Sequence, residues 1–204
     1  MAPDVPPTPS RRSAARERLL AAATTLFYTE GINSVGVGRI VAEGDVTLAT
    51  FYRHFPGKQD LVVAYLQGVH AEIAERLDEV AAATSGRDLI LALGDDVAAD
   101  MGRPGFRGCA FMNAAAEFED PTDPVRVAVA DHRRWYHETV RRAFAAAGHG
   151  YPGNAARHFV MLRDGAMAAG YLDSAVTARR TLSRGVRGLV QSIGVEASHP
   201  SDDG

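Results

Sequence analysis

The segment from Val35 to Asp60 most constrains how this chain folds, because the helical spacing of its apolar residues is interrupted twice. Three apolar residues share the i, i+3, i+4 spacing of one helix face, namely Val37, Ile40 and Val41. Gly44 and Asp45 then break that spacing. Thr47 can cap a second short helix over 48–54, which a proline and a glycine end. The pattern predicts two short helices joined by a tight turn, with a third helix directly after them.

The second short helix is about two turns long and carries small, hydroxyl, aromatic and basic side chains. Such a helix is a poor core element, but it fits the major groove of DNA, which is about 12 Å wide and admits one helix. The run Thr-Phe-Tyr-Arg-His-Phe-Pro-Gly-Lys over 50–58, with Ile-Val-Ala-Glu and Val-Thr before it, resembles the tetracycline-repressor-like (TetR) family of bacterial transcription regulators. The resemblance covers residues 11–66 and implies a helix-turn-helix DNA-binding domain.

The sequence departs from the family pattern at two places in this domain. The turn position that commonly holds glycine is Asp45, with Gly44 just before it. Aspartate tolerates the left-handed backbone conformation better than most residues, so the turn can still form. Gly36 and Val37 replace the Thr or Ser that commonly starts the first short helix, which removes a hydroxyl cap and a phosphate contact. These changes weaken the expected DNA contacts more than the expected fold.

Helical signals dominate the rest of the sequence, in which alanine is abundant and β-branched alternation is almost absent. We expect an all-α fold of about nine helices, with an N-terminal three-helix helix-turn-helix DNA-binding domain and a C-terminal helical ligand-binding and dimerisation domain. Beyond the two short helices, helices are predicted over 13–29, 57–83, 87–102, 108–118, 124–147, 153–171 and 175–194. The expected divisions are a disordered tail (1–10), the DNA-binding domain (11–58), the effector-binding and dimerisation domain (59–195) and a disordered tail (196–204).

The formal net charge of −3 is unevenly distributed along the chain. Residues 11–58 hold seven basic and four acidic residues, so their net charge is +3 and the rest of the chain carries −6. A basic end on an acidic body fits a protein that binds the phosphate backbone at one end only. A net charge of +3 over this span can also arise by chance, so charge alone does not establish DNA binding.

Several classes of protein are disfavoured by composition and motifs. The sequence contains no run of about 18 apolar residues, so it predicts no membrane span. Its Pro-rich N-terminus lacks the apolar core of a secretory signal. The one cysteine, Cys109, excludes an internal disulfide framework and fits a cytoplasmic protein. An enzyme is the less favoured alternative, because His132 and His137 are five positions apart and do not share a helix face for a metal. We expect no catalytic residues, no metal and no cofactor.

The candidate DNA contacts lie in and beside the second short helix: Arg39, Thr47, Leu48, Ala49, Thr50, Tyr52, Arg53, His54 and Lys58. Leu48 and Ala49 can contact a thymine methyl group but cannot form the bidentate pairs that read guanine or adenine. The resemblance gives Tyr52 a phosphate-contacting position. Lys58 begins the next helix, where its charge and the helix dipole together favour a phosphate oxygen.

Some residues of this region have structural interpretations as well. Arg53 can be a solvated surface charge, and His54 can be a capping or packing residue. Phe51 and Phe55 are expected in the core, because they lie on the apolar face of the helix.

Residues 104–118 resemble a segment found in a branch of the same family, through the run Arg-Gly-Cys-Ala-Phe-Met-Asn-Ala-Ala-Ala-Glu-Phe. Bulky apolar residues around an alanine-rich helix leave room for an apolar small molecule, and the family generally holds an effector in this domain. The candidate ligand-binding residues are Phe106, Cys109, Phe111, Met112, Asn113, Ala116, Glu117, Trp135, Met161, Met167 and Tyr171. The alternative is that they fill a helical core, with Asn113 and Glu117 bonding only to neighbouring backbone.

Cys109 has three interpretations. It can be a small buried hydrophobe, it can line the pocket, or it can be a thiol sensor whose pKa is lowered by Arg107.

The last two long helices hold small residues at close spacing, which would let helices approach tightly. The resemblance implies that these helices pair with their copies in a second chain as a four-helix interface. The candidate dimer contacts are Met161, Gly165, Ala168, Ala169, Leu172, Leu182, Gly185, Val186 and Leu189. A palindromic DNA site needs such a dimer, with recognition helices about 34–36 Å apart or a multiple of that distance. The alternative is that these residues pack only within one chain.

The favoured hypothesis is a sequence-specific DNA-binding transcription regulator, a repressor that a small apolar effector releases from a palindromic operator. Its expected partners are double-stranded DNA, an effector and a second copy of the chain, with no membrane. An effector-insensitive architectural DNA binder is a further alternative, and it would show little sequence preference and a steep dependence on salt.

Overall fold

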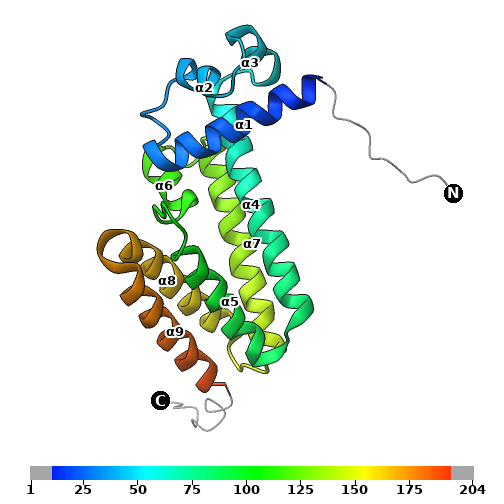
Figure 1. The fold of residues 1–204 in the computed structure, drawn as a ribbon. Helices are drawn as coiled ribbons and strands as arrows, with labels where there is room; N and C mark the ends of the chain where they lie inside the picture. The colour runs from blue at the N-terminus through cyan, green and yellow to red at the C-terminus, as the bar shows by residue number, and fades with distance from the viewer. Residues whose placement is uncertain (1–10, 194–204) are drawn as a thin grey trace, which may run out of the picture.

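A computed structural model describes residues 11–193 of the chain, so the predicted tails over 1–10 and 196–204 lie outside the described residues (Figure 1). The described part is all-α, as predicted, and contains no strand. Its helices are α1 (Arg11–Glu30), α2 (Val37–Glu43), α3 (Leu48–His54), α4 (Lys58–Ala83), α5 (Gly86–Asp100), α6 (Ala110–Glu117), α7 (Pro124–Ala146), α8 (Pro152–Ala169) and α9 (Ala175–Gln191). A π-helical turn, η1 (Gly170–Ser174), connects α8 to α9.

The N-terminal helices α1, α2 and α3 pack together at one end of the molecule, against the first turns of α4 (Figure 1). Their shared core contains fully buried Leu19, Ile40 and Phe51. Phe27 and Tyr65 meet edge-on, with ring centroids 5.8 Å apart, and join α1 to α4. The sequence prediction that Phe51 and Phe55 are core residues is confirmed, since both rings are buried.

The 26-residue helix α4 runs from this end into the body of the molecule. Its N-terminus is fixed locally, because the Gly57 N–H donates to the Asp60 carboxylate over 2.9 Å. Leu61 and Leu66 are buried near its start and Leu77 is buried near its end. One continuous helix therefore contributes to the cores of both halves.

The body is a helical bundle in which α7 packs on α4 and α8, and α5 packs on α9 and α7. Glycine permits the closest approaches. An added Cβ at Gly94 of α5 would lie 3.1 Å from a methyl group of Val186, and one at Gly185 would lie 2.9 Å from a methyl group of Leu162. No helix within residues 11–193 is long and apolar enough to cross a membrane.

The connection between α8 and α9 agrees with the sequence prediction in where α9 begins, at Ala175. It differs at the end of α8, where the chain passes at Gly170 into the π turn η1. Ser174 is extended and caps α9 by accepting a hydrogen bond from the Thr177 N–H over 3.4 Å. A widened helical turn followed by one extended residue therefore connects the two helices.

Candidate nucleic-acid interface and effector cavity

The recognition helix α3 presents an apolar and hydroxyl-bearing face to solvent. The side chains of Leu48 and Tyr52 are 51% and 55% exposed, although both are large and apolar or aromatic. Thr47 caps the helix, accepting a hydrogen bond from the Thr50 N–H over 3.2 Å, and the two hydroxyl oxygens lie 2.9 Å apart. Ala49 is also exposed, so the first turn of α3 has no bulky neighbour that would keep it from a DNA groove.

The turn between α2 and α3 has the geometry that the sequence predicted. Asp45 adopts a φ of +48°, in the left-handed region, and it is the one non-glycine residue with a positive φ among those described. An added Cβ at Gly44 would lie 3.3 Å from the Ile40 carbonyl oxygen of α2 and 3.5 Å from the Arg18 carbonyl oxygen of α1, so a side chain fits tightly here. Gly44 therefore occupies a crowded position, while Asp45 supplies the unusual backbone conformation.

Arg18 of α1 fixes this turn in place, a role that the sequence did not reveal. Its Nε donates to the Gly44 carbonyl oxygen over 3.0 Å, and its Nη2 donates to the Asp45 carbonyl oxygen over 3.3 Å. The two partners lie 26 and 27 positions away, so no local pattern indicates the contact. Arg16 makes a second such link, with its guanidinium 5.2 Å from the centroid of the Phe55 ring.

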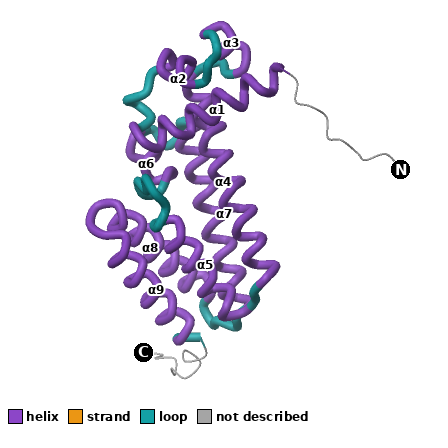
Figure 2. Tube along the Cα trace, in the orientation of Figure 1, coloured by secondary structure: helices purple, strands orange, loops and turns teal. Residues whose placement is uncertain are grey.

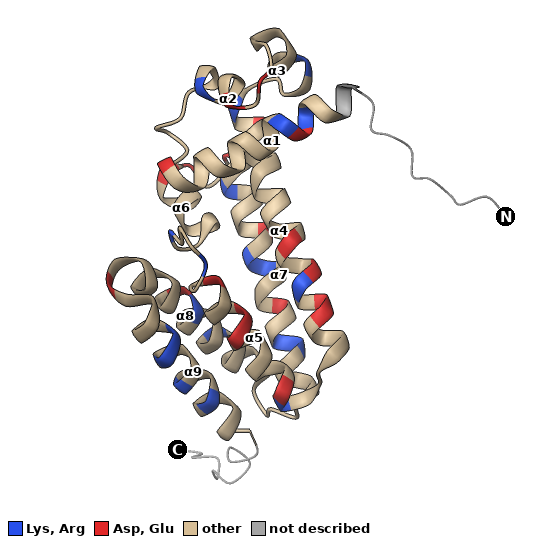
Figure 3. Ribbon diagram, viewed as in Figure 1, with Lys and Arg blue, Asp and Glu red and all other residues tan. Residues whose placement is uncertain are grey.

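Basic side chains lie on α1, α2 and α3 and also on α7 and along α9, while acidic side chains concentrate on α4 and α5 (Figure 3). Two of the predicted DNA contacts have protein partners. Arg39 lies 3.7 Å from the Glu30 carboxylate and 3.5 Å from the Glu43 carboxylate. The Lys58 ammonium lies 6.0 Å from the centroid of the Phe27 ring, and partial burial lowers the pKa of Lys58. Arg53 is exposed and His54 is half-buried.

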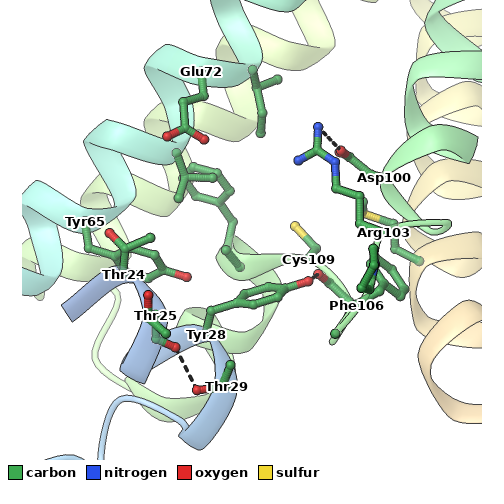
Figure 4. Close-up of a pocket in the computed structure, with 18 of the residues that line it drawn as sticks. Thr24, Thr25, Tyr28, Thr29, Tyr65, Glu72, Asp100, Arg103, Phe106 and Cys109 are labelled. Atoms are coloured by element: carbon green, nitrogen blue, oxygen red, sulfur yellow. Dashed lines mark hydrogen bonds and ion pairs between the residues drawn. The ribbon is translucent and has the colours of Figure 1, made fainter. Parts of the chain in front are cut away.

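A cavity of about 410 Å³ lies beneath this end, and it is called the effector cavity because the sequence prediction expects an effector in this domain. Its walls come from α1, α4, the loop before α6, the start of α6 and α8. Tyr28, Phe106 and Cys109 surround one space in Figure 4, with Tyr65 and Glu72 of α4 across from them. Two further cavities adjoin Phe111: the inner cavity, about 220 Å³, between α6, α7 and α8, and a cavity of about 370 Å³ between α4 and α7.

The eleven predicted ligand-binding residues do not line one cavity. Four line the effector cavity: Phe106, Cys109, Phe111 and Met167. Met112 lines the inner cavity, and Trp135 lines the cavity between α4 and α7. Asn113 donates to the Arg107 carbonyl oxygen over 3.0 Å and is exposed. Ala116, Met161 and Tyr171 are exposed, and none of the three lines these cavities.

Glu117 bonds to backbone, which is one of the two interpretations that the sequence left open. Its carboxylate accepts hydrogen bonds from the backbone N–H groups of Ile32, over 2.9 Å, and Asn33, over 2.5 Å. The Asn33 side chain returns a hydrogen bond to the Glu117 carbonyl oxygen over 3.2 Å. Glu117 thus ties the end of α6 to the loop between α1 and α2.

Tyr28 makes a second tie between the two halves, and the sequence did not reveal it either. Its hydroxyl donates to the Gly108 carbonyl oxygen over 3.0 Å and accepts from the Arg107 N–H over 2.9 Å. Figure 2 shows the loop between α1 and α2 and the loop before α6 on the same side of the molecule. The segment from Gly108 to Glu117 is therefore attached to the N-terminal helices at both of its ends.

Cys109 is buried, and the charge beside its sulfur is not the predicted one. Nη2 of Arg163 lies 3.3 Å from the Cys109 Sγ, whereas the Arg107 guanidinium lies over the Tyr171 ring, 5.5 Å from its centroid. Arg163 is itself buried and is held by Asp164, whose carboxylate accepts from Nη1 over 2.8 Å. The neighbour that the sequence suggested for the thiol is therefore replaced by one from α8.

The predicted dimer residues fall into two groups. Met161 and Leu172 are 69% and 74% exposed, and they lie with Gly165 on the outer surface of α8 and η1. Ala168, Ala169 and Leu189 are half-buried. Three residues correct the prediction, because they already pack inside the chain. Val186 is buried against Gly94, Gly185 makes the close approach to Leu162 described above, and Leu182 is buried.

This helix-turn-helix end on a helical body matches known regulators. Residues 19–65 match the family model for bacterial regulatory proteins of the tetR family. The crystal structure of SCO4454, a TetR-family transcriptional regulator from Streptomyces coelicolor, is 46% identical, covers 89% of this chain and 96% of that chain, and has a TM-score of 0.86. The chain belongs to the TetR family of transcriptional regulators.

Two curated relatives agree with this assignment. The HTH-type transcriptional repressor NemR of Escherichia coli is 29% identical over 117 residues, which are 56% of this chain and 59% of NemR. The HTH-type transcriptional regulator LmrA of Bacillus subtilis is 32% identical over 63 residues, which are 30% of this chain and 34% of LmrA. The matched part spans less than two thirds of either relative. Members of the family regulate transcription and are not enzymes.

Proposed function

We propose that this protein is a repressor that binds a palindromic operator as a homodimer and leaves it when a small apolar effector enters the effector cavity. In this proposal, residues 11–58 form the DNA-binding domain and residues 59–195 form the effector-binding and dimerisation domain. Acting on chromosomal DNA places the protein in the cytoplasm. Double-stranded DNA, the effector and a second copy of the chain are its partners.

The observation that carries this proposal is the attachment of α6 to the N-terminal helices at both ends. Cys109 and Phe111 line the effector cavity, and the same segment is tied to α1 through Tyr28 and to the loop before α2 through Glu117. A ligand that displaces this segment also displaces α1 and α2. The ligand can lower DNA affinity only by as much as its own affinity for the displaced arrangement exceeds its affinity for the DNA-binding arrangement.

The exposed face of α3 supports the DNA-binding half of the proposal. In this proposal the exposed residues Leu48 and Ala49 contact thymine methyl groups, and the hydroxyls of Thr47 and Tyr52 bind phosphate oxygens. The exposed apolar face around Met161 and Leu172 supports the homodimer, because a patch of large apolar side chains on a helical surface marks an interaction site. Two recognition helices would then read successive grooves.

Selection of operator fragments from a random duplex library, followed by mobility-shift titration, tests DNA binding. Replacing Tyr52 and Lys58 together by alanine should weaken binding to every sequence, and loss of the Lys58 charge should lower the salt slope by about one phosphate. Val127→Ala, an exposed apolar site on α7, is the matched control. Unchanged duplex affinity in the double variant would contradict the assignment of α3.

The switch is tested separately, through the tie at Glu117. In Glu117→Gln a single amide oxygen replaces the two carboxylate oxygens that accept from Ile32 and Asn33, so the tie to the loop before α2 is weakened. We expect the protein to bind the effector as before, but the effector should release it from DNA less completely. Glu119→Gln, an exposed carboxylate two positions on, is the control. Full release by the Glu117→Gln protein would remove α6 from the mechanism.

A further inference from the structure

The inner cavity contains three buried polar atoms that have no hydrogen-bond partner within the described chain. They are Nε2 of His132 and the hydroxyl oxygen of Tyr136, both on α7, and Nε of Arg163, on α8. All three side chains line the same cavity of about 220 Å³. Buried polar groups are normally paired, so three unpaired groups on side chains that line one cavity are available to bond a molecule held there.

The cavity also carries an excess of positive charge. Arg126, Arg133 and Arg163 line it, and no carboxylate does. Asp164 neutralises part of this charge, since its carboxylate binds Arg133 over 2.6 Å and Arg163 over 2.8 Å. Both Nη atoms of Arg163 are already engaged, by Asp164 and by the Cys109 sulfur, and its Nε–H is left without an acceptor.

His132 is held neutral and rigid beside these groups. Burial, aided by the charge of Arg163, lowers its pKa to about 3. Its Nδ1 lies 3.0 Å from Nδ1 of His70, and its ring stacks on Phe111 at a centroid distance of 3.6 Å with an interplanar angle of 1°. The ring therefore adds an aromatic wall and one polar edge without adding a second cation.

The remaining wall is apolar, formed by Phe111, Met112 and Val160 among others. An apolar cavity of roughly 150 Å³ accommodates benzene. The inner cavity therefore has room for one aromatic ring together with a small polar substituent.

We infer that the inner cavity binds a single-ring aromatic carboxylate, whose oxygens accept hydrogen bonds from the Tyr136 hydroxyl and the Arg163 Nε–H. This inference rests on the proposed function and changes two of its details: the effector carries a carboxylate on its apolar ring, and it lies in the inner cavity that adjoins the effector cavity. Phe111, Cys109 and Arg163 line both the inner cavity and the effector cavity, so a ligand here acts on the same segment that is tied to α1. The carboxylate supplies the acceptor that a purely apolar effector lacks.

Fluorescence of the full-length protein, without DNA, tests this site. Trp135 is the sole tryptophan, and its ring centroid lies 5.6 Å from that of His132. Benzoate should change its emission saturably, and benzamide, which is neutral and nearly isosteric, should bind at least about tenfold more weakly. Tyr136→Phe should raise the Kd for benzoate about tenfold, and it should raise the Kd for benzamide by a smaller factor. Tyr151→Phe, an exposed tyrosine in the loop before α8, should leave both values unchanged.

Equal affinities for benzoate and benzamide, or an unaltered benzoate Kd in Tyr136→Phe, would overturn the inference, as would no saturable response to benzoate. Circular dichroism of each variant verifies that it is folded. Failure here leaves the proposed function intact if the protein still binds its operator. Conversely, benzoate that binds the site but leaves operator affinity unchanged supports the site and contradicts the proposed switch.

Discussion

The recognition helix and the inner cavity depart from ordinary burial in opposite directions. On α3, the large side chains of Leu48 and Tyr52 face solvent, while the hydroxyl groups beside them are paired with each other. Around the inner cavity, polar atoms of Tyr136 and Arg163 are buried and unpaired. Exposed apolar groups gain free energy when a partner covers them, whereas buried unpaired polar groups gain it when a partner supplies a hydrogen bond.

The largest expected effect is a difference in stability loss between alanine variants of two neighbouring aromatic residues of α3. Phe51→Ala should lower the free energy of unfolding by about 3–5 kcal/mol, because the ring is fully buried in the N-terminal core. Tyr52→Ala should change it by less than about 1 kcal/mol while weakening DNA binding, because its ring is exposed. Urea denaturation of both variants provides the measurement. A large stability loss in Tyr52→Ala would mean that this exposed face serves the fold.

The next effect concerns pH and the inner cavity. Burial lowers the pKa of His132 from 6.5 to about 3, so below pH 6.5 the unfolded chain binds a proton at this residue that the folded chain excludes. Its contribution to stability is complete above that pH and falls toward pH 3, by at most about 1.4 kcal/mol per pH unit. His132→Gln should flatten the pH dependence of urea midpoints, and His158→Gln, on the exposed face of α8, should not. Parallel curves for His132→Gln and wild type would contradict the assignment.

A smaller effect tests whether the unpaired Tyr136 hydroxyl lowers the stability of the ligand-free protein. Removing an unpaired buried hydroxyl relieves its desolvation, so Tyr136→Phe should raise the free energy of unfolding of the ligand-free protein by about 1 kcal/mol. The same variant is expected to bind benzoate more weakly, as described above. Differential scanning calorimetry without ligand measures the change. Destabilisation would indicate that the hydroxyl has a structural partner.

The smallest effect lies in the turn before α3. Asp45→Gly should stabilise the protein by up to about 1 kcal/mol, because glycine adopts a positive φ without the steric cost that a Cβ imposes. Asp45→Ala should not stabilise it. Thermal unfolding of both variants measures the difference. An equal change in both would show that the backbone conformation at this position is not what limits stability.

The DNA-binding end was predictable to the residue where its signals were local. Thr47 as a cap and the proline after Phe55 set the bounds of α3, which the structure gives as Leu48–His54. The conformation of Asp45 followed from its place in the turn. Arg18 was not recognised as the clamp of that turn, because its partners lie 26 and 27 positions along the chain.

The effector region was predictable only in outline. The sequence predicts that apolar residues such as Trp135, Met112 and Phe106 face inward, but it does not show which element each one meets. The structure distributes these three among separate cavities. The same limit explains Gly185, whose small size indicated a close helix approach correctly. The partner is Leu162 of the same chain, and only the packing of α8 on α9 specifies that.

The sequence by itself determined the helices, their order and the short capped helix that is offered to DNA, because capping, turn residues and apolar spacing act over a few positions. The tertiary structure alone decided that Glu117 and Tyr28 join the two halves and that His132, Tyr136 and Arg163 meet around one cavity. Those contacts depend on how whole helices pack in space, and each joins residues that lie far apart in the chain or sit on different helices.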